Sequence, residues 1–144
     1  TSNFSGNALG SNYKLFQQSD PVLKALENDL TKITSEFFES DIFIDDSFFR
    51  ILKGEGQVKK HTHLDNIDKL EKLDLYKNKF SLVYYIKTGD TDCSEPGFLN
   101  LYNPKDKILP KPGMIIIFPS DRPHSVKYDG KSDRMIFSIN FYSY

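Results

Sequence analysis

The sequence HSVKYDGKSDRMIFSINFY at residues 124–142 combines two runs of strand-forming residues with a turn between them. β-Branched and aromatic residues recur through Ser125–Tyr128 and Arg134–Tyr142, and such residues favour strands. The intervening Asp129-Gly130 is a dipeptide typical of tight hairpins. The pattern therefore predicts two antiparallel strands, paired with each other across this turn.

Short apolar runs of the same kind occur upstream of this stretch, each bounded by turn residues. They are Ser47–Leu52, Phe80–Ile86, Gly97–Tyr102 and Met114–Phe118. A turn-rich loop, Thr88–Pro96, separates two of them. Seven or so short strands with frequent turns predict a mostly β (α+β) protein, a double-stranded β-helix or jelly roll.

The N-terminal part of the chain has a different pattern. Residues 1–18 are expected to form an arm or a short edge strand, and Asp20 and Pro21 are suited to the N-cap and first position of a helix. Apolar residues then recur at helical spacing, so a helix over Asp20–Phe38 should pack on the outer face of the sheet; they are Val22, Leu23, Leu26, Leu30, Ile33 and Phe37. We expect one domain over 1–144, with arm and helix in 1–46 and the jelly-roll core in 47–144.

Composition argues against several classes of protein. The chain has 19 basic and 20 acidic residues, a net charge of −1, so no overall field would attract nucleic acid or an anionic membrane. Its longest apolar run, Met114–Phe118, is far shorter than the roughly 20 residues of a membrane-spanning helix. Cys93 is the only cysteine and can form no internal disulfide, which fits a reducing compartment. These features lead us to expect a cytoplasmic protein.

All three histidines lie in two short segments, His61-Thr62-His63-Leu64-Asp65 and Pro123-His124. On a strand, residues two apart project to the same face, so His63 and Asp65 could reach one ion while Leu64 points away. With His124 they would form two imidazoles and one carboxylate, the ligand set of non-haem Fe(II) oxygenases. His61 shares the face of His63, so a His61-x-His63 pair is the alternative source of the third ligand.

Arg134 follows His124 by ten residues. Its planar guanidinium could bind the far carboxylate of a 2-oxo acid that chelates the metal. Ser138 should share the face of Arg134 on the same strand, and the Tyr85 phenol could be a further donor to this co-substrate. The segment Asn66–Lys79, next to the metal-binding segment, is either a lid or a solvated connector.

Several of these motifs together resemble the 2-oxoglutarate- and Fe(II)-dependent dioxygenases, specifically their prolyl 4-hydroxylase-like branch, over about residues 48–142. His63-Leu64-Asp65-Asn66 is similar to the H-x-D-N motif of that branch, and Val83-Tyr84-Tyr85 to its (I/V)-Y-Y strand. Gly97–Tyr102 resembles its G-x-L-x-(L/I) strand, and residues 118–126 resemble the segment with the distal histidine. Arg134 stands where the family has its 2-oxoglutarate-binding basic residue.

The resemblance implies Fe(II) held by His63, Asp65 and His124, and 2-oxoglutarate held by Arg134 and Tyr85. It also implies O2 as co-substrate, ascorbate to keep the iron reduced, and hydroxylation of a prolyl residue in a peptide or protein. A free amino acid or small metabolite is the alternative substrate. The segment from Asp65 to Tyr85 is longer than in the family, and Gly54–Gly56 matches only loosely.

A cupin-type metal-binding protein, or a non-catalytic jelly-roll module, is the alternative class. His61-x-His63 after Gly56 resembles one cupin motif, but the first glutamate after it is Glu71, and His124 trails Gly113 by eleven residues. A cupin also has no need for a basic residue at the position of Arg134.

Overall fold

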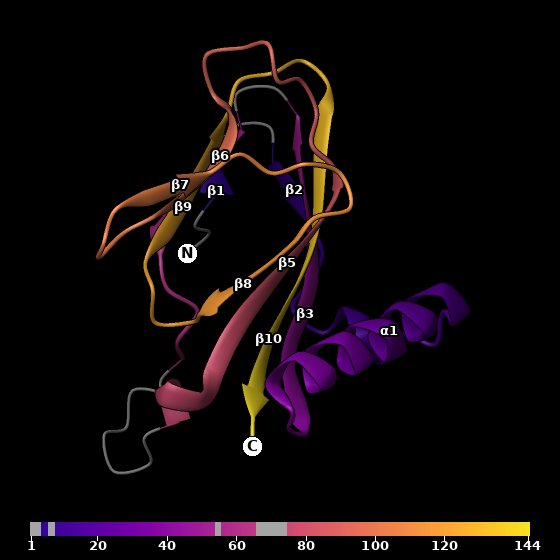
Figure 1. Cartoon of the computed structure of the whole chain (residues 1–144). Helices are drawn as coiled ribbons and strands as arrows, with labels where there is room; N and C mark the ends of the chain where they lie inside the picture. Colours follow the sequence, from indigo (N-terminus) through magenta and orange to yellow (C-terminus); the bar gives the residue numbers. More distant parts are fainter. Residues whose placement is uncertain (1–3, 6–7, 54–55, 66–74) are drawn as a thin grey trace.

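The computed structural model describes residues 4–5, 8–53, 56–65 and 75–144 (Figure 1). Two antiparallel five-stranded sheets face each other across the molecule. The first has the order β1-β4-β9-β6-β7 and the second the order β2-β3-β10-β5-β8. The strands are β1 (Phe4–Ser5), β2 (Ala8–Gly10), β3 (Ile42–Lys53), β4 (Gly56–His61), β5 (Lys79–Lys87), β6 (Pro96–Leu101), β7 (Asp106–Ile108), β8 (Ile115–Pro119), β9 (His124–Tyr128) and β10 (Asp133–Ser143).

The helix α1 (Pro21–Phe38) lies along the outer face of the second sheet, beside β3 and β10 (Figure 1). The Asp20 carboxylate accepts hydrogen bonds from the backbone N–H groups of Val22 and Leu23, which confirms the predicted N-cap. Of the predicted apolar stripe, Leu23, Leu26 and Leu30 pack toward the sheet, whereas Val22, Ile33 and Phe37 are exposed, so the prediction is wrong for these three. Thr34 and Phe38 continue the inward-facing line at the C-terminal end of the helix.

The larger hydrophobic core lies between α1 and the sheet rather than between the two sheets. Its buried members are Leu15 and Phe16 in the 3-10 helix η1 (Leu15–Gln17), Leu30 of α1, and Leu82, Phe137, Ile139 and Phe141 from β5 and β10. The interior between the sheets has a smaller apolar cluster centred on Leu99, Leu101 and Phe118. Space on the inner faces therefore remains for polar side chains.

The hairpin predicted across Asp129-Gly130 is wrong. Strand β9 pairs with β4 and β6 in the first sheet, whereas β10 pairs with β3 and β5 in the second. The connection crosses between sheets, and hydrogen bonds to the loop between β5 and β6 hold it. The Asp90 carboxylate accepts hydrogen bonds from the N–H groups of Lys131 and Ser132, and the Asp129 carboxylate accepts one from the N–H of Glu95.

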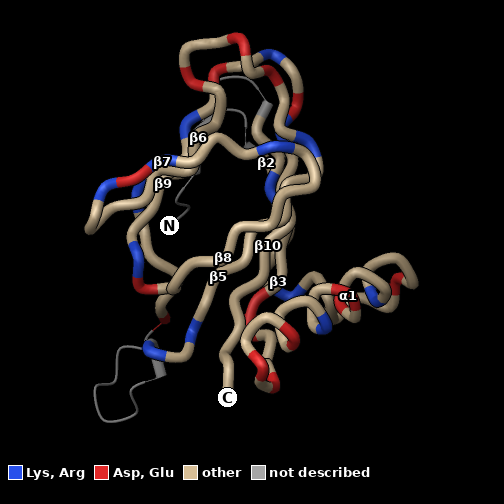
Figure 2. The backbone as a smooth tube through the Cα atoms, viewed as in Figure 1, with Lys and Arg blue, Asp and Glu red and all other residues tan. Residues whose placement is uncertain are grey.

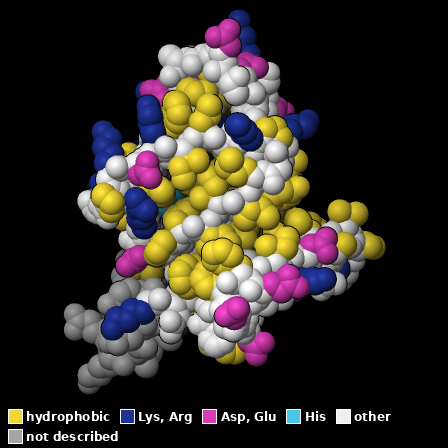
Figure 3. All heavy atoms as spheres, viewed as in Figure 1, with side chains coloured by type: hydrophobic (Ala, Val, Ile, Leu, Met, Phe, Trp, Pro, Cys, Tyr) yellow, Lys and Arg dark blue, Asp and Glu magenta, His cyan; other side chains and the backbone are white. Residues whose placement is uncertain are grey.

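The surface of the described residues has interspersed charges of both signs and an area rich in hydrophobic side chains (Figure 2 and Figure 3). Basic and acidic residues are interspersed along the loops and α1 (Figure 2). Hydrophobic side chains gather over β5 and β8 on the face seen in Figure 3, where α1 does not reach. Among the described residues, no helix is both long enough and apolar enough to cross a membrane.

A 3-10 helix η2 (Leu75–Asn78) precedes β5. Most of the segment predicted as a lid or connector, residues 66–74, lies outside the described residues.

Candidate active site

A cavity of about 220 Å³ lies between the inner faces of the two sheets. Alternate residues of β3, β5 and β10 line one wall, because side chains alternate between the two faces of a strand. The β10 members are Arg134, Ile136, Ser138 and Asn140. Strands β4 and β9 contribute His61, Val58, His124 and Val126 to the opposite wall.

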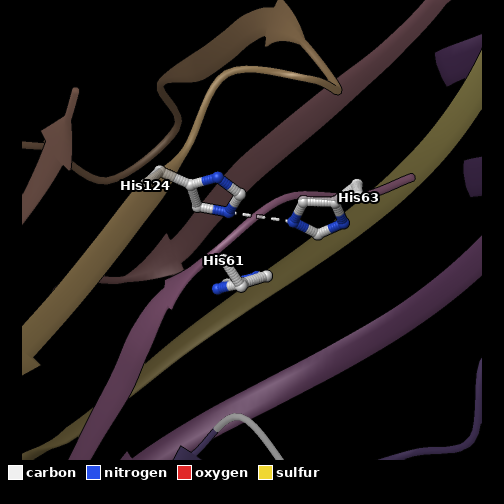
Figure 4. Close-up of side chains that lie close together, drawn as sticks. All are labelled: His61, His63 and His124. Atoms are coloured by element: carbon white, nitrogen blue, oxygen red, sulfur yellow. Dashed lines mark hydrogen bonds between the residues drawn. The ribbon is translucent and has the colours of Figure 1, made fainter. Parts of the chain in front are cut away.

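The three histidines meet in this cavity (Figure 4). His61 is the last residue of β4 and lies directly opposite His124, the first residue of β9. His63 follows two residues later, and its Nε2 lies 2.9 Å from the Nε2 of His124. One ring nitrogen from each histidine can be chosen so that all three lie within 4.8 Å of one another. The fold therefore gathers three potential nitrogen ligands at one point.

Backbone carbonyls orient two of the three rings. The Nδ1 of His61 lies 2.6 Å from the Lys59 carbonyl oxygen, and the Nδ1 of His124 lies 3.2 Å from that of Arg122. A carbonyl oxygen can only accept a hydrogen bond, so each Nδ1 carries the proton and donates it. The Nε2 of both rings is then left with a lone pair, and such outer hydrogen bonds commonly fix the tautomer of metal-binding histidines.

Burial keeps these imidazoles neutral near pH 7. It lowers the pKa of His124 from 6.5 to about 4, with the charge of His61 as a further cause. It also lowers the pKa of His63 well below its usual value, with the nearby His124 and His61 acting in the same direction. The pKa of His61 is lowered mainly by burial as well. Neutral imidazole is the form that binds metals.

These pKa shifts predict that the metal-free protein loses stability as the pH falls from about 6.5 to about 4. In this range the unfolded chain binds a proton at residue 124 that the folded chain does not bind, so protonation favours unfolding. For His124 alone the loss in free energy of unfolding should be about 3 kcal/mol.

Denaturant unfolding of the chelator-treated protein at several pH values measures this effect. A His124→Gln variant should show a flatter pH profile, and subtracting the two profiles removes the contribution of titrating carboxylates. Identical slopes for the two proteins would contradict the buried, neutral state of His124.

Asp65 lies at the edge of the histidine cluster rather than within it. Its side chain is 51% exposed, and its Oδ2 lies 3.8 Å from the Nζ of Lys79. The prediction that His63 and Asp65 share one strand face, with Leu64 pointing away, is wrong: β4 ends at His61, and Leu64 lines the cavity together with Asp65. The physical reason is that β9 begins at His124, opposite His61, and offers no partner for a longer β4.

Arg134 and Tyr85 lie together on the wall formed by β10 and β5. Arg134 is 3% exposed, its Nη2 donates a hydrogen bond to the Gly97 carbonyl at 3.2 Å, and its guanidinium lies 5.4 Å from the centre of the Tyr85 ring. Its Nε is buried and has no hydrogen-bond partner among the residues that the structure describes. A buried N–H donor without a partner is costly, so this part of the cavity suits an anionic acceptor.

Burial is the main cause of the pKa shifts in this pair. It lowers the pKa of Arg134 and raises the pKa of Tyr85, and the interaction between the two side chains partly opposes both shifts. Ser138 lines the cavity as predicted, but its hydroxyl donates to the Leu82 carbonyl at 2.7 Å. Its oxygen remains able to accept a further hydrogen bond.

Gly97 makes room for Arg134, a role that sequence reasoning missed. Its φ is +89°, and a Cβ at this position would lie 2.5 Å from the Nε and 2.9 Å from the Cδ of Arg134. Both the backbone conformation and the close approach therefore require glycine. The sequence signal that could have indicated this role is the position of Gly97 at the start of the apolar run Gly97–Tyr102.

Lys79 was also missed, although the alternation through Tyr85, Val83 and Ser81 places it on the same strand face. It is almost fully buried, lines the cavity, and its Nζ lies 3.2 Å from the Oδ2 of Asp45. The Ser120 N–H donates to the Lys79 carbonyl, and the Ser120 carbonyl accepts from the His63 N–H. This backbone connection holds the His63 segment beside β5.

A buried polar network continues from Ser120 across the cavity wall. The Ser120 and Ser81 hydroxyls lie 3.0 Å apart, and Ser81 donates to the Asn140 side-chain oxygen at 2.8 Å. The Asn140 amide in turn donates to the Asp46 carboxylate at 3.0 Å, and burial raises the pKa of Asp46. The end of the cavity with Asp46 and Lys79 is therefore polar and holds charges of both signs.

Residues 48–142 match the family model of the 2OG-Fe(II) oxygenase superfamily. This segment is more than half of the chain and includes all three histidines, Asp65, Tyr85 and Arg134. No curated protein sequence matches the chain. The family match favours the dioxygenase interpretation over the cupin alternative.

Solved structures of such oxygenases have the same fold. The viral collagen prolyl hydroxylase of Paramecium Bursaria Chlorella virus-1, a complex with 2OG, has a TM-score of 0.69 at 16% identity, over 96% of this chain and 80% of its own. HygX from Streptomyces hygroscopicus, with nickel and 2-oxoglutarate bound, has a TM-score of 0.70 at 11% identity, over 95% and 70%. These similarities confirm the predicted jelly roll.

A third structure, an oxidoreductase of the 2OG-Fe(II) oxygenase family from Burkholderia pseudomallei, has a TM-score of 0.64 at 14% identity and is matched over 85% of this chain. The chain spans 57% of the length of the Burkholderia protein and 34% of that of EvdMO1, another matched structure.

Proposed function

Because the chain belongs to the 2OG-Fe(II) oxygenase superfamily, we propose that it is an Fe(II)- and 2-oxoglutarate-dependent hydroxylase that acts on prolyl residues of a peptide or protein. The main support for 2-oxoglutarate as co-substrate comes from Arg134. Its buried Nε has no hydrogen-bond partner among the described residues, and its side chain lines the same cavity as the three histidines.

The donor set fits the proposed metal. His63 and His124 offer neutral imidazole nitrogens, and Asp65, on the same segment as His63, is the proposed carboxylate ligand. Two imidazoles and one carboxylate suit Fe(II) and leave coordination positions open. Asp65 would exchange its contact with Lys79 for the ion.

The far end of the cavity fits 2-oxoglutarate. Arg134 would bind the distal carboxylate through its planar fork of donors, and the Tyr85 hydroxyl would add a hydrogen bond. Ser138 would contribute by turning its hydroxyl from the Leu82 carbonyl to donate to this carboxylate. The apolar neighbours Leu52, Leu99 and Ile136 would keep water from this charge pair and strengthen it.

When bound, the iron and 2-oxoglutarate supply the oxidising chemistry, hydroxylation coupled to decarboxylation of the 2-oxo acid to succinate and CO2. The chain would supply the ligands and a cavity with apolar side chains beside the proposed 2-oxoglutarate site. Backbone carbonyls hold the His61 and His124 rings in place, and Ser120 holds the backbone of His63. Ascorbate would serve to keep the iron reduced.

The prolyl substrate is supported by the sequence resemblance and by the shared fold with a viral collagen prolyl hydroxylase. A free amino acid or small metabolite is the second candidate, and the polar end of the cavity favours it. Asp46, Lys79 and Asn140 there could bind the ionic groups of a small substrate.

Two measurements test the function. Anaerobic addition of 2-oxoglutarate to the Fe(II)-loaded protein should produce the weak visible charge-transfer band of a chelated 2-oxo acid. Peptide libraries should then gain the mass of one oxygen atom on proline, with release of succinate. Turnover of free proline or another metabolite, with no reaction on any proline peptide, would overturn the peptide assignment and leave the hydroxylase assignment intact.

Gly97→Ala should weaken 2-oxoglutarate binding, because the added Cβ displaces the Arg134 side chain. Gly113→Ala is the matched control: its φ is +84°, yet a Cβ there has nothing within 4 Å. Both variants should lose about 1–3 kcal/mol of stability from backbone strain. Only Gly97→Ala should raise the dissociation constant of 2-oxoglutarate, measured by calorimetry. Equal affinities in the two variants would contradict the proposed role of Arg134.

A further inference from the structure

We propose that His61 completes a three-histidine binding site, with His63 and His124, that holds a divalent transition-metal ion before 2-oxoglutarate binds. This inference deepens the proposed function, since it concerns the first state of the same metal centre. It assigns His61 the role of a displaceable ligand. The ion would pass to Asp65 only when the co-substrate enters.

The geometry of the three rings supports a shared ion. Nitrogens bound to one ion at about 2.0–2.1 Å lie roughly 3–4 Å from each other. The three candidate nitrogens lie within 4.8 Å of one another, and the Nε2 atoms of His63 and His124 are 2.9 Å apart. The three nitrogens therefore lie near the spacing that one shared ion requires, and Figure 4 shows the three rings grouped together.

The backbone already presents His61 in a form that can bind metal. Its position opposite His124 is set by the β4–β9 register, and its Nδ1 donates to the Lys59 carbonyl. His61 and His124 thus have the same outer-shell arrangement, a backbone carbonyl on Nδ1 that leaves Nε2 for the ion.

Asp65, in contrast, has to move before it can bind. Its carboxylate is half-exposed and lies 3.8 Å from the buried ammonium of Lys79, outside the group of three imidazoles. If His63, His124 and Asp65 hold the iron in turnover, 2-oxoglutarate and O2 would need the remaining positions on the ion, and His61 would have to release it. We therefore assign His61 to the state without 2-oxoglutarate.

Zn(II) titration followed by NMR of the imidazole groups tests the proposal in the wild-type protein, without 2-oxoglutarate. The chain has three histidines, so the 15N spectrum contains three ring systems, which His61→Gln assigns by the loss of one of them. All three should shift to metal-bound values at one equivalent of Zn(II). Shifts confined to His63 and His124 would overturn the proposal.

Zn(II) affinities of variants provide the second test. His61→Ala and His61→Gln should each bind Zn(II) more weakly by at least on the order of tenfold, whereas Asp65→Ala should stay within a few-fold of wild type. Thr62→Val, between the two histidines, is the control and should match wild type. Equal affinity of the His61 variants and wild type would reject the three-histidine site. Since 2-oxoglutarate is absent throughout, this failure is distinct from a failure of the proposed hydroxylase activity.

Discussion

Arg134→Ala should weaken 2-oxoglutarate binding by about 2–5 kcal/mol, on the order of thirty- to several-thousand-fold, with little effect on metal affinity. The guanidinium is almost fully buried, so its pairing with a carboxylate would be poorly screened by water. The metal ligands lie on other segments, and their geometry does not depend on this side chain. Calorimetric titration of 2-oxoglutarate and, separately, of the metal measures both affinities.

Two further variants make this prediction sharper. Arg134→Lys keeps the charge but loses the planar fork, so its 2-oxoglutarate affinity should fall between wild type and Arg134→Ala. Arg122→Ala removes a guanidinium that bonds the carbonyls of Tyr102 and Pro104 and should leave 2-oxoglutarate binding unchanged. Equal losses of metal and 2-oxoglutarate affinity in Arg134→Ala would mean that Arg134 is structural.

Asp65→Ala should abolish turnover, because it removes the only anionic ligand of the proposed catalytic centre. His61→Ala should retain a substantial part of turnover at saturating Fe(II), since His61 leaves the ion when 2-oxoglutarate binds. Succinate release at saturating Fe(II) and 2-oxoglutarate measures both. The two variants therefore separate the ligand used in turnover from the ligand used in metal capture.

Asp121→Ala is the control for the loss of a carboxylate near the site and should turn over like wild type. The reversed result, an inactive His61→Ala and an active Asp65→Ala, would mean that the catalytic ligands are the three histidines. In that case the assignment of Asp65 as a metal ligand would be wrong, and the metal would still bind in the same cavity.

Local sequence signals predicted the elements whose formation depends on neighbouring residues. The Asp20-Pro21 start of α1 and its approximate length could be read from the chain, because capping is decided within one turn. The strand β5 was also predicted, since Phe80–Ile86 is rich in strand formers. The placement of Arg134 and Ser138 on one face follows from the alternation along β10, and both line the cavity.

Strand pairing could not be predicted in the same way. Asp129-Gly130 has the local signature of a hairpin, yet β9 and β10 belong to different sheets. The Asp90 carboxylate, from a distant loop, holds the crossing connection in place. Contacts between residues about 40 positions apart override the local preference here, and no short stretch of sequence contains that information.

By itself, then, the sequence determined the class of fold, the two segments with histidines and the arginine that follows the second. These features could be identified because each depends only on the types of residues and their spacing along the chain. Only the tertiary structure decided which groups meet at the centre. Strand β4 ends where β9 begins, so His61 lies opposite His124 and Asp65 falls beyond the strand, next to Lys79. Alternation along a strand predicts the direction of a side chain only as far as a partner strand extends that strand.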